Sequence, residues 1–137
     1  SLTSQEVAAD ASFARFLIDR FSAPPPRVIL TGKLVEASSV PTPESIAPYR
    51  SSLVSCVYEV QKITSGSLST SRVLVKHWGL LNLKLTAEFP REIGRTYELS
   101  IERESDHPEL KGERVSDDTA AFDLEPWLDV GRPLSRK

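Results

Sequence analysis

Apolar and polar side chains alternate along residues 53–64, where β-branched and aromatic residues are interleaved with polar ones. A period of two predicts a β-strand, and the following Ser65-Gly66-Ser67 predicts a turn. Residues 72–79 have the same composition. The two runs therefore predict an antiparallel hairpin with a loop of about half a dozen residues. We expect this hairpin to form the centre of a small β-barrel.

Two neighbouring stretches also have strand character. Residues 27–38 are rich in β-branched and aliphatic side chains, and Gly32 stands where a strongly bent strand often has a glycine or a bulge. Residues 80–86 alternate leucines with polar side chains. This second stretch is either a separate short strand or a continuation of the preceding strand past a bend at Gly79.

The second half of the chain predicts one clear strand and two less regular segments. Residues 95–102 alternate cleanly, with Tyr97, Leu99 and Ile101 expected to point inward. Residues 104–119 are polar and acidic, which predicts a long exposed loop. Residues 120–130 predict either a closing strand or an irregular return over the barrel, and Pro126 favours an edge position because proline cannot donate to a central ladder.

The amino-terminal residues predict a helix. Thr3-Ser4-Gln5-Glu6 matches a capping box, and apolar residues recur at helical spacing up to Phe21, before three consecutive prolines. We therefore expect residues 1–26 to form a helix and a proline linker, and residues 27–137 to form the barrel. The expected fold is mainly β, a small antiparallel OB-fold-like β-barrel with one N-terminal α-helix packed on it, in a single domain.

Charge and composition limit the kinds of partner that the chain is expected to bind. The net charge of −2 disfavours nucleic acid, because proteins that bind phosphate backbones usually carry a basic surplus. Residues 102–129 hold ten acids and three bases, a local charge of −7, which fits either a face for a cation or basic partner or a solvated loop. The sequence has no apolar run long enough to span a bilayer. The absence of methionine and the start at Ser1 predict a piece cut from a longer protein or a processed form.

Motifs for nucleophilic catalysis and cofactors are absent from the sequence. There is no Gly-x-Ser-x-Gly elbow and no Gly-rich phosphate loop, so we expect no cofactor. Cys56, the only cysteine, excludes an internal disulfide and lies mid-strand, where it is expected to be buried and inert.

Binding candidates come from one loop and one strand end. The loop of residues 40–50 carries three prolines, which keep it stiff, and it presents Tyr49 and Arg50. This loop is either a binding edge or a wrap around the barrel. At the end of the second central strand, His77 and Trp78 fit a general base or a sugar-stacking site. The alternative is that His77 caps the barrel through a backbone hydrogen bond.

Four acids in the polar segment are candidates for a metal site. Calcium requires six to eight oxygen ligands, and Asp106, Glu109, Asp117 and Asp118 supply such oxygens, although their spacing matches no EF-hand loop. The alternative is a solvated acidic loop.

Three of the predicted strand segments resemble a known family. The runs 31–35, 58–66 and 73–75 are similar to the strand pattern of netrin-like and tissue-inhibitor-of-metalloproteinase-like OB domains, over about fifty residues. The resemblance implies an OB barrel. Protease inhibition does not follow from it, because this chain lacks the amino-terminal cysteine and the disulfides of those inhibitors.

A second resemblance is to bacterial extracytoplasmic segments found beside cell-surface polysaccharide acetylation proteins. It rests on residues 46–50, 58–60 and 75–78. We therefore expect a non-catalytic binding or protein-interaction module of a larger bacterial extracytoplasmic protein, periplasmic or secreted, with a protein or polysaccharide partner. The alternatives are an accessory polysaccharide-binding domain, for which Trp78 or Trp127 should be exposed in a groove, and an enzyme that uses His77 or His107.

Overall fold

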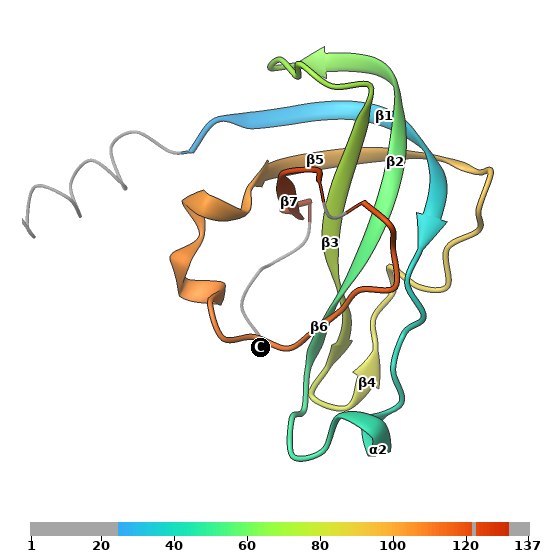
Figure 1. Ribbon diagram of the computed structural model, residues 1–137, viewed down its shortest axis with the longest axis vertical. Coiled ribbons are helices and arrows are strands. Elements are labelled where there is room, and N and C mark those ends of the chain that lie inside the picture. The colour runs from blue at the N-terminus through green and yellow to red at the C-terminus, as the bar shows by residue number, and fades with distance from the viewer. Residues whose placement is uncertain (1–24, 122, 132–137) are drawn as a thin grey trace, which may run out of the picture.

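A computed structural model describes residues 25–121 and 123–131 and shows a mainly β chain (Figure 1). The predicted amino-terminal helix lies outside the described residues. Within the part that is described, no helix is long and apolar enough to cross a membrane. The elements, in chain order, are β1 (Arg27–Ala37), α2 (Pro43–Ile46), β2 (Ser52–Ser65), β3 (Arg72–Leu81), β4 (Lys84–Leu85), β5 (Thr96–Arg103), the 3-10 turns η1 (Glu104–Asp106) and η2 (Pro108–Leu110), β6 (Val115–Ser116) and β7 (Pro126–Asp129).

Five of these strands form a closed barrel. The pairings run β1 to β2, β2 to β3, β3 to β7, β7 to β5 and β5 back to β1. The β2–β3 hairpin is confirmed as predicted, with a loop over residues 66–71. The barrel is not wholly antiparallel, because β3 and β7 pair in parallel. The edge position predicted for Pro126 is also wrong: β7 lies between β3 and β5, and Pro126 is its first residue, where a missing N–H is tolerated.

Strand β1 pairs with both β2 and β5, so it must coil strongly to close the ring. Its register against β2 shifts in three places, one of them between Thr31 and Gly32. A Cβ at Gly32 would lie 3.0 Å from the Cβ of Tyr58. The predicted bend at Gly32 is therefore confirmed, and glycine is the residue that lets β1 approach β2 this closely.

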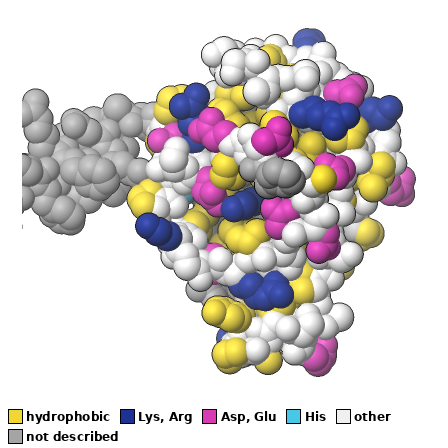
Figure 2. Space-filling view, viewed as in Figure 1, with side chains coloured by type: hydrophobic (Ala, Val, Ile, Leu, Met, Phe, Trp, Pro, Cys, Tyr) yellow, Lys and Arg dark blue, Asp and Glu magenta, His cyan; other side chains and the backbone are white. Residues whose placement is uncertain are grey.

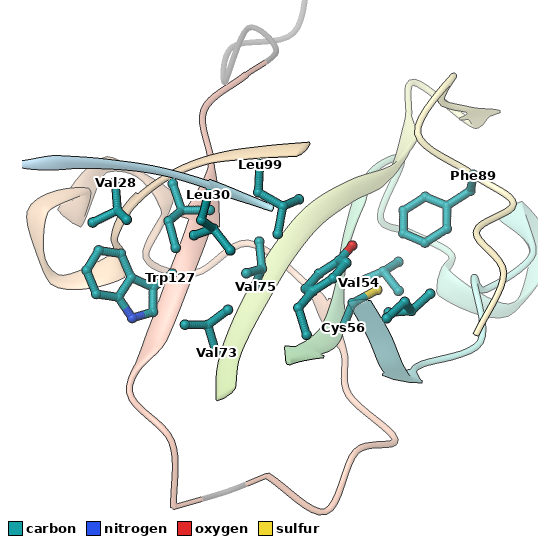
Figure 3. Packing of buried hydrophobic residues seen from close by; sticks show 12 residues of the cluster. Val28, Leu30, Val54, Cys56, Val73, Val75, Phe89, Leu99 and Trp127 are labelled. Carbon is teal, nitrogen blue, oxygen red and sulfur yellow. The ribbon is translucent and has the colours of Figure 1, made fainter. Parts of the chain in front are cut away.

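The core lies inside the barrel. Figure 3 shows side chains from several strands pointing toward one another, with Trp127 and Phe89 on opposite sides of the cluster in this view. The inward positions of the predicted hairpin and of β5 are confirmed, because Val54, Cys56 and Tyr58 on β2 and Leu99 and Ile101 on β5 are all buried. Cys56 is buried as expected, and burial raises the pKa of its thiol to about 11.

Part of the acidic segment that follows β5 lies against β2 and β3. In this segment β6 pairs in parallel with the start of β2, and Ala121 packs against Val57 and Leu74. The first half of β2 is consequently buried on both faces. The prediction of a long exposed loop over residues 104–119 is therefore correct only in part: His107 is its one buried residue, but the segment also contains two 3-10 turns and a short strand.

The leucine-rich stretch after Gly79 completes β3 and then reverses direction. Asn82 and Leu83 form a two-residue turn with φ of 50° and 68°, and β4 pairs back onto β3. Both residues of such a turn require positive φ, for which Asn-Gly is preferred. Leucine in this region costs roughly 1–2 kcal/mol relative to an unstrained residue. The backbone at Leu83 is therefore strained.

Candidate functional site

A chain of polar side chains crosses the otherwise apolar barrel interior. Tyr58 on β2 and His77 on β3 point inward by strand alternation, and their side chains meet with the Tyr58 hydroxyl 2.7 Å from His77 Nε2. Asp129, at the end of β7, lies with Oδ2 2.8 Å from His77 Nδ1. Tyr58 and His77 are almost fully buried. Three strands that are distant in sequence thus build one buried network.

The Asp129 carboxylate sets the direction of the hydrogen bonds in this network, because it can only accept. A neutral His77 therefore carries its proton on Nδ1, donates it to Asp129, and accepts from the Tyr58 hydroxyl at Nε2. Arg91, in the loop before β5, donates from Nη1 to the Tyr58 hydroxyl oxygen over 3.2 Å. A backbone N–H of Gly131 satisfies the other Asp129 oxygen at 2.9 Å. Each of these polar atoms therefore has a partner without any proton transfer.

The ionisation of the network follows from burial and its neighbours. Burial raises the pKa of Tyr58 well above its ordinary value, so the phenol is a neutral donor. Burial alone would raise the pKa of Asp129 as well, but the hydrogen bond from His77, with smaller contributions from the Gly131 N–H and the Arg91 charge, holds it below its usual range. Asp129 is thus a carboxylate, and it orients His77 in the tautomer that accepts from Tyr58.

His77, Glu88 and Asp129 form the one group of three potential metal ligands in the described part of the chain whose ligand atoms lie within 4.8 Å of one another. Arg91 is the cation that the group already holds. Its Nη2 pairs with the Glu88 carboxylate, and its Nε donates to the Glu88 carbonyl over 3.0 Å. Both ring nitrogens of His77 are also bonded. A metal bound by all three side chains would have to break the Arg91–Glu88 pair and the His77–Asp129 hydrogen bond.

A polar pocket of about 290 Å³ opens beside this network and is lined by Glu88, Arg91, Asp129 and three further residues. The Tyr58 hydroxyl and the His77 ring are not part of its lining. A ligand there would meet carboxylates and a guanidinium group, but neither the phenol nor the imidazole. Asp129 and Arg91 therefore face this pocket, whereas the Tyr58 phenol and the His77 imidazole do not.

The second histidine, His107, follows the end of β5 and lies between two carboxylates. His107 Nε2 is 2.7 Å from Glu102 Oε1, and His107 Nδ1 is 2.7 Å from Glu109 Oε2. Arg27 Nε donates to the other Glu102 oxygen at 2.9 Å. A neutral imidazole has one N–H, so both bonds form together only when the ring or a carboxyl group carries an additional proton. These contacts tie η1 and η2 to β5 and β1.

His107 also lines a pocket of about 520 Å³ between residues 104–113 and the barrel. The pocket wall contains apolar side chains from β2, η2, β6 and β7, including Leu53, Leu110, Val115 and Pro126. Charged residues complete the lining. We call this cavity the loop pocket. Figure 2 shows acidic side chains interspersed with Lys and Arg over the face that this segment covers. The charged lining residues are Glu104, Lys111, Glu113 and Glu125, together with His107.

The four predicted binding residues fall into two pairs. Tyr49 and Arg50 are exposed in the loop after α2, with Tyr49 54% exposed. His77 and Trp78 are buried, at 1% and 7% exposure. The structure does not bring the four together. The predicted backbone hydrogen bond for His77 is replaced by the side-chain bonds to Tyr58 and Asp129.

The four predicted metal ligands are likewise spread over two places. Asp106 lies on η1 and Glu109 on η2, where Glu109 contacts His107. Asp117 accepts from the Thr119 hydroxyl at 2.7 Å, and Asp118 accepts from the Ser39 N–H at 3.0 Å. Among the described residues these acids do not form a group of three with ligand atoms within 4.8 Å. A cation site in this segment stays a prediction.

Six residues of the two polar clusters were not candidate site residues in the sequence: Tyr58, Glu88, Arg91, Asp129, Arg27 and Glu102. One signal was present, because His77 shares strand parity with Val73 and Val75 and is therefore expected to point inward. A buried imidazole needs polar partners. That argument predicts that partners exist, but the strand pairing that supplies them is not visible in the sequence.

No family model, curated protein or solved structure matches this chain. The assignment of a function therefore rests on the geometry described above.

Proposed function

We propose that this chain is a non-catalytic binding module whose partner is a basic, partly apolar segment of another protein. The observation that carries the proposal is the loop pocket, which combines an apolar wall with an acidic border on the most acidic part of the chain. Apolar side chains in a concave site supply affinity, and a few charged groups at its border supply orientation. Three of the four Asp, Glu and Lys residues in the lining are acidic.

The bonding of the two histidines favours a binding role over catalysis. A general base needs a free lone pair within reach of the substrate. His107 has carboxylates at both nitrogens, and His77 is enclosed between Tyr58 and Asp129. Both have the carboxylate neighbour that an enzyme would need. Neither has an open nitrogen facing a cavity.

The burial of the tryptophans favours a protein partner over a polysaccharide. Stacking on sugar rings requires an exposed aromatic face. Trp78 and Trp127 are each 7% exposed, and Arg103 covers the Trp127 ring with its guanidinium carbon 5.5 Å from the ring centroid. The exposed aromatic side chain, Tyr49, is not part of the loop pocket lining.

We also propose an OB-type fold for the barrel. In chain order the five strands are β1, β2, β3, β5 and β7, and β5 returns to pair with β1, which is the Greek-key closure of OB barrels. A netrin-like relationship and a place in a larger extracytoplasmic bacterial protein rest on the sequence resemblances alone. The fold does not decide the function.

Fluorescence anisotropy with short synthetic peptides tests the proposed binding. The probes are labelled peptides of alternating lysine and leucine, of lysine and serine, and of glutamate and leucine. At about 0.15 M ionic strength, where charges are screened beyond roughly 8 Å, the lysine-leucine peptide should bind more tightly than the other two. The serine peptide separates charge from apolar contact. Equal binding of all three peptides, or of none, would contradict the proposal.

A charge-matched pair of variants locates the site. The variant E113K/E125K reverses two acids of the loop pocket and should weaken binding of the lysine-leucine peptide at least about tenfold, equivalent to about 1.4 kcal/mol. The control E59K/E92K makes the same change in net charge on exposed residues outside the pocket lining. If both variants lose affinity equally, binding follows overall charge and the loop pocket is not the site.

A further inference from the structure

Exposed large apolar side chains are concentrated at one end of the barrel. Of the five such residues among those described, three lie at this end: Tyr49 at 54%, Leu83 at 37% and Leu85 at 55% exposure. The other two, Ile63 and Ile93, lie elsewhere. We call the exposed end formed by residues 47–50 and 82–85 the barrel tip. It is separate from the loop pocket.

Hydrogen bonds hold the two segments of the barrel tip side by side. The Leu83 N–H donates to the Arg50 carbonyl over 2.7 Å, and the Asn82 N–H donates to the Ser51 hydroxyl over 3.1 Å. Leu85 is held by its pairing with Leu80 on β3. Figure 1 shows α2 and β4 together at the lower end of the long axis, and Figure 2 shows apolar side chains at that end.

The turn at the barrel tip presents a leucine where turn stability favours another residue. Leu83 has φ of 68° at the second position of a two-residue hairpin turn, where glycine is preferred. Its strained backbone nevertheless supports a bulky apolar side chain that is partly exposed. Strained residues cluster where structure serves binding. Folding stability therefore does not account for the leucine.

Two cations flank the exposed apolar side chains. Arg50 and Lys84 are both exposed, and residues 43–50 and 82–85 contain one acid, Glu44. We propose that the barrel tip docks on a membrane surface that contains anionic lipid, with Tyr49, Leu83 and Leu85 entering the interfacial region. Tyrosine is favoured at that depth, and Arg and Lys place their charges among the headgroups while their alkyl stems stay with the apolar side chains.

A lipid surface fits the barrel tip better than a folded protein partner does. The apolar side chains lie on a turn and a loop at the end of the long axis, so they form a projection and not a groove. A fluid interface accommodates a projection, whereas a protein partner must offer a matching cavity. The acidic segment that would be repelled by anionic lipid, residues 102–129, contributes no residue to the barrel tip.

Vesicle co-sedimentation of the full chain tests this inference. Vesicles of phosphatidylcholine with about a third phosphatidylglycerol should bind the protein at least about fivefold more tightly than pure phosphatidylcholine, because contacts of Arg50 and Lys84 with anionic headgroups add to apolar insertion. The key variant is Leu83→Gly. It removes the side chain and relieves the backbone strain, because glycine adopts positive φ without a steric cost. It should lower vesicle binding severalfold while leaving Tm unchanged or higher. The control Ile93→Ser, at the most exposed apolar residue described, should change neither quantity.

The outcomes separate the alternatives. Vesicle binding that is unchanged in Leu83→Gly, absent in the wild type, or independent of anionic lipid overturns the inference. Capture of a protein that requires Leu83, without vesicle binding, overturns it in favour of a protein partner. The variant E113K/E125K should bind vesicles at least as well as the wild type, so the barrel tip and the loop pocket fail or succeed independently.

Discussion

The substitution Tyr58→Phe tests the buried network most simply, because it removes one oxygen atom and keeps the ring. That oxygen donates to His77 Nε2 at 2.7 Å and accepts from Arg91 Nη1 at 3.2 Å. Phenylalanine leaves an unpaired acceptor on a histidine side chain that is 0% exposed. It also leaves one unpaired donor on Arg91, whose side chain is 8% exposed.

The expected cost follows from these two orphaned groups. A buried polar group left without its partner costs about 1–3 kcal/mol, with more for charged groups. Arg91 keeps its two bonds to Glu88, so the larger share comes from His77. We expect a loss of about 2–4 kcal/mol in the free energy of unfolding. That is a large part of the roughly 5–15 kcal/mol that typically stabilises a domain.

Urea unfolding followed by tryptophan fluorescence measures this loss. The midpoint should fall while the m-value stays unchanged, which marks a change in stability and not in compactness. The control is Tyr97→Phe, an identical chemical change at a hydroxyl that accepts from the exposed Glu92 N–H at 2.9 Å. Water replaces that partner, so its cost should stay below about 1 kcal/mol. Equal losses in the two variants would refute the account of the network.

Three further predictions concern backbone packing, pH and thiol reactivity. Gly79→Ala places a Cβ 2.4 Å from Val54 Cγ2 and should lower stability by about 1–3 kcal/mol in urea unfolding, and an unchanged midpoint would contradict the packing of β3 on β2. The pKa of Asp129 is lower in the folded than in the unfolded protein, so its contribution is present above its ordinary pKa of 3.8 and is lost as pH falls through the folded value. The stability difference between wild type and Asp129→Asn should therefore shrink on acidification below about pH 4, and a difference that grows would be inconsistent with it. Cys56, with a pKa of about 11 and 0% exposure, should react with a thiol reagent only as fast as the barrel opens, so rapid labelling of the native protein would show that β2 is misplaced.

The strands with a strong period of two could be predicted from the sequence alone. Residues 53–64, 72–79 and 95–102 alternate over many positions, and strands β2, β3 and β5 form there. The predicted inner positions at the start of β2 and in the second half of β5 are buried, although both faces of the first half of β2 are covered. Gly32 was also informative, because a glycine inside a strand signals a bend or a close approach. These features are local, and local patterns are sufficient to determine them.

The closure of the barrel could not be predicted in the same way. Strand β7 has four residues and begins with Pro126, so its local signal is weak, and its position between β3 and β5 depends on pairing with strands far away in the sequence. The structure of the polar segment of residues 104–119 was predicted only in part, for a related reason. Its charged side chains indicate solvent exposure, but β6 pairs with the edge of β2, and Ala121, just after the segment, packs against Val57 and Leu74.

For the candidate sites, too, local features could be predicted from the sequence and long-range contacts could not. His77 was identified as a site residue, and its inward direction follows from its parity with Val75. Its partners could not be found, because Asp129 reaches it only through the parallel pairing of β3 and β7, and Arg91 reaches the network from a loop. The loop pocket is invisible in the sequence for the same reason, since its wall combines residues from four separate elements.

The most direct test of the proposed function is a nuclear magnetic resonance titration of the isotope-labelled chain with the lysine-leucine peptide. If the chain is a binding module of the proposed kind, saturable shifts of amide signals should be concentrated in residues 104–115 and at Leu53 and Glu125. Trp127 should shift as well, because it follows Pro126, which has no amide proton of its own. The lysine-serine peptide should produce much smaller changes. Shifts scattered over every acidic patch, or centred on residues outside the loop pocket, would contradict the proposal.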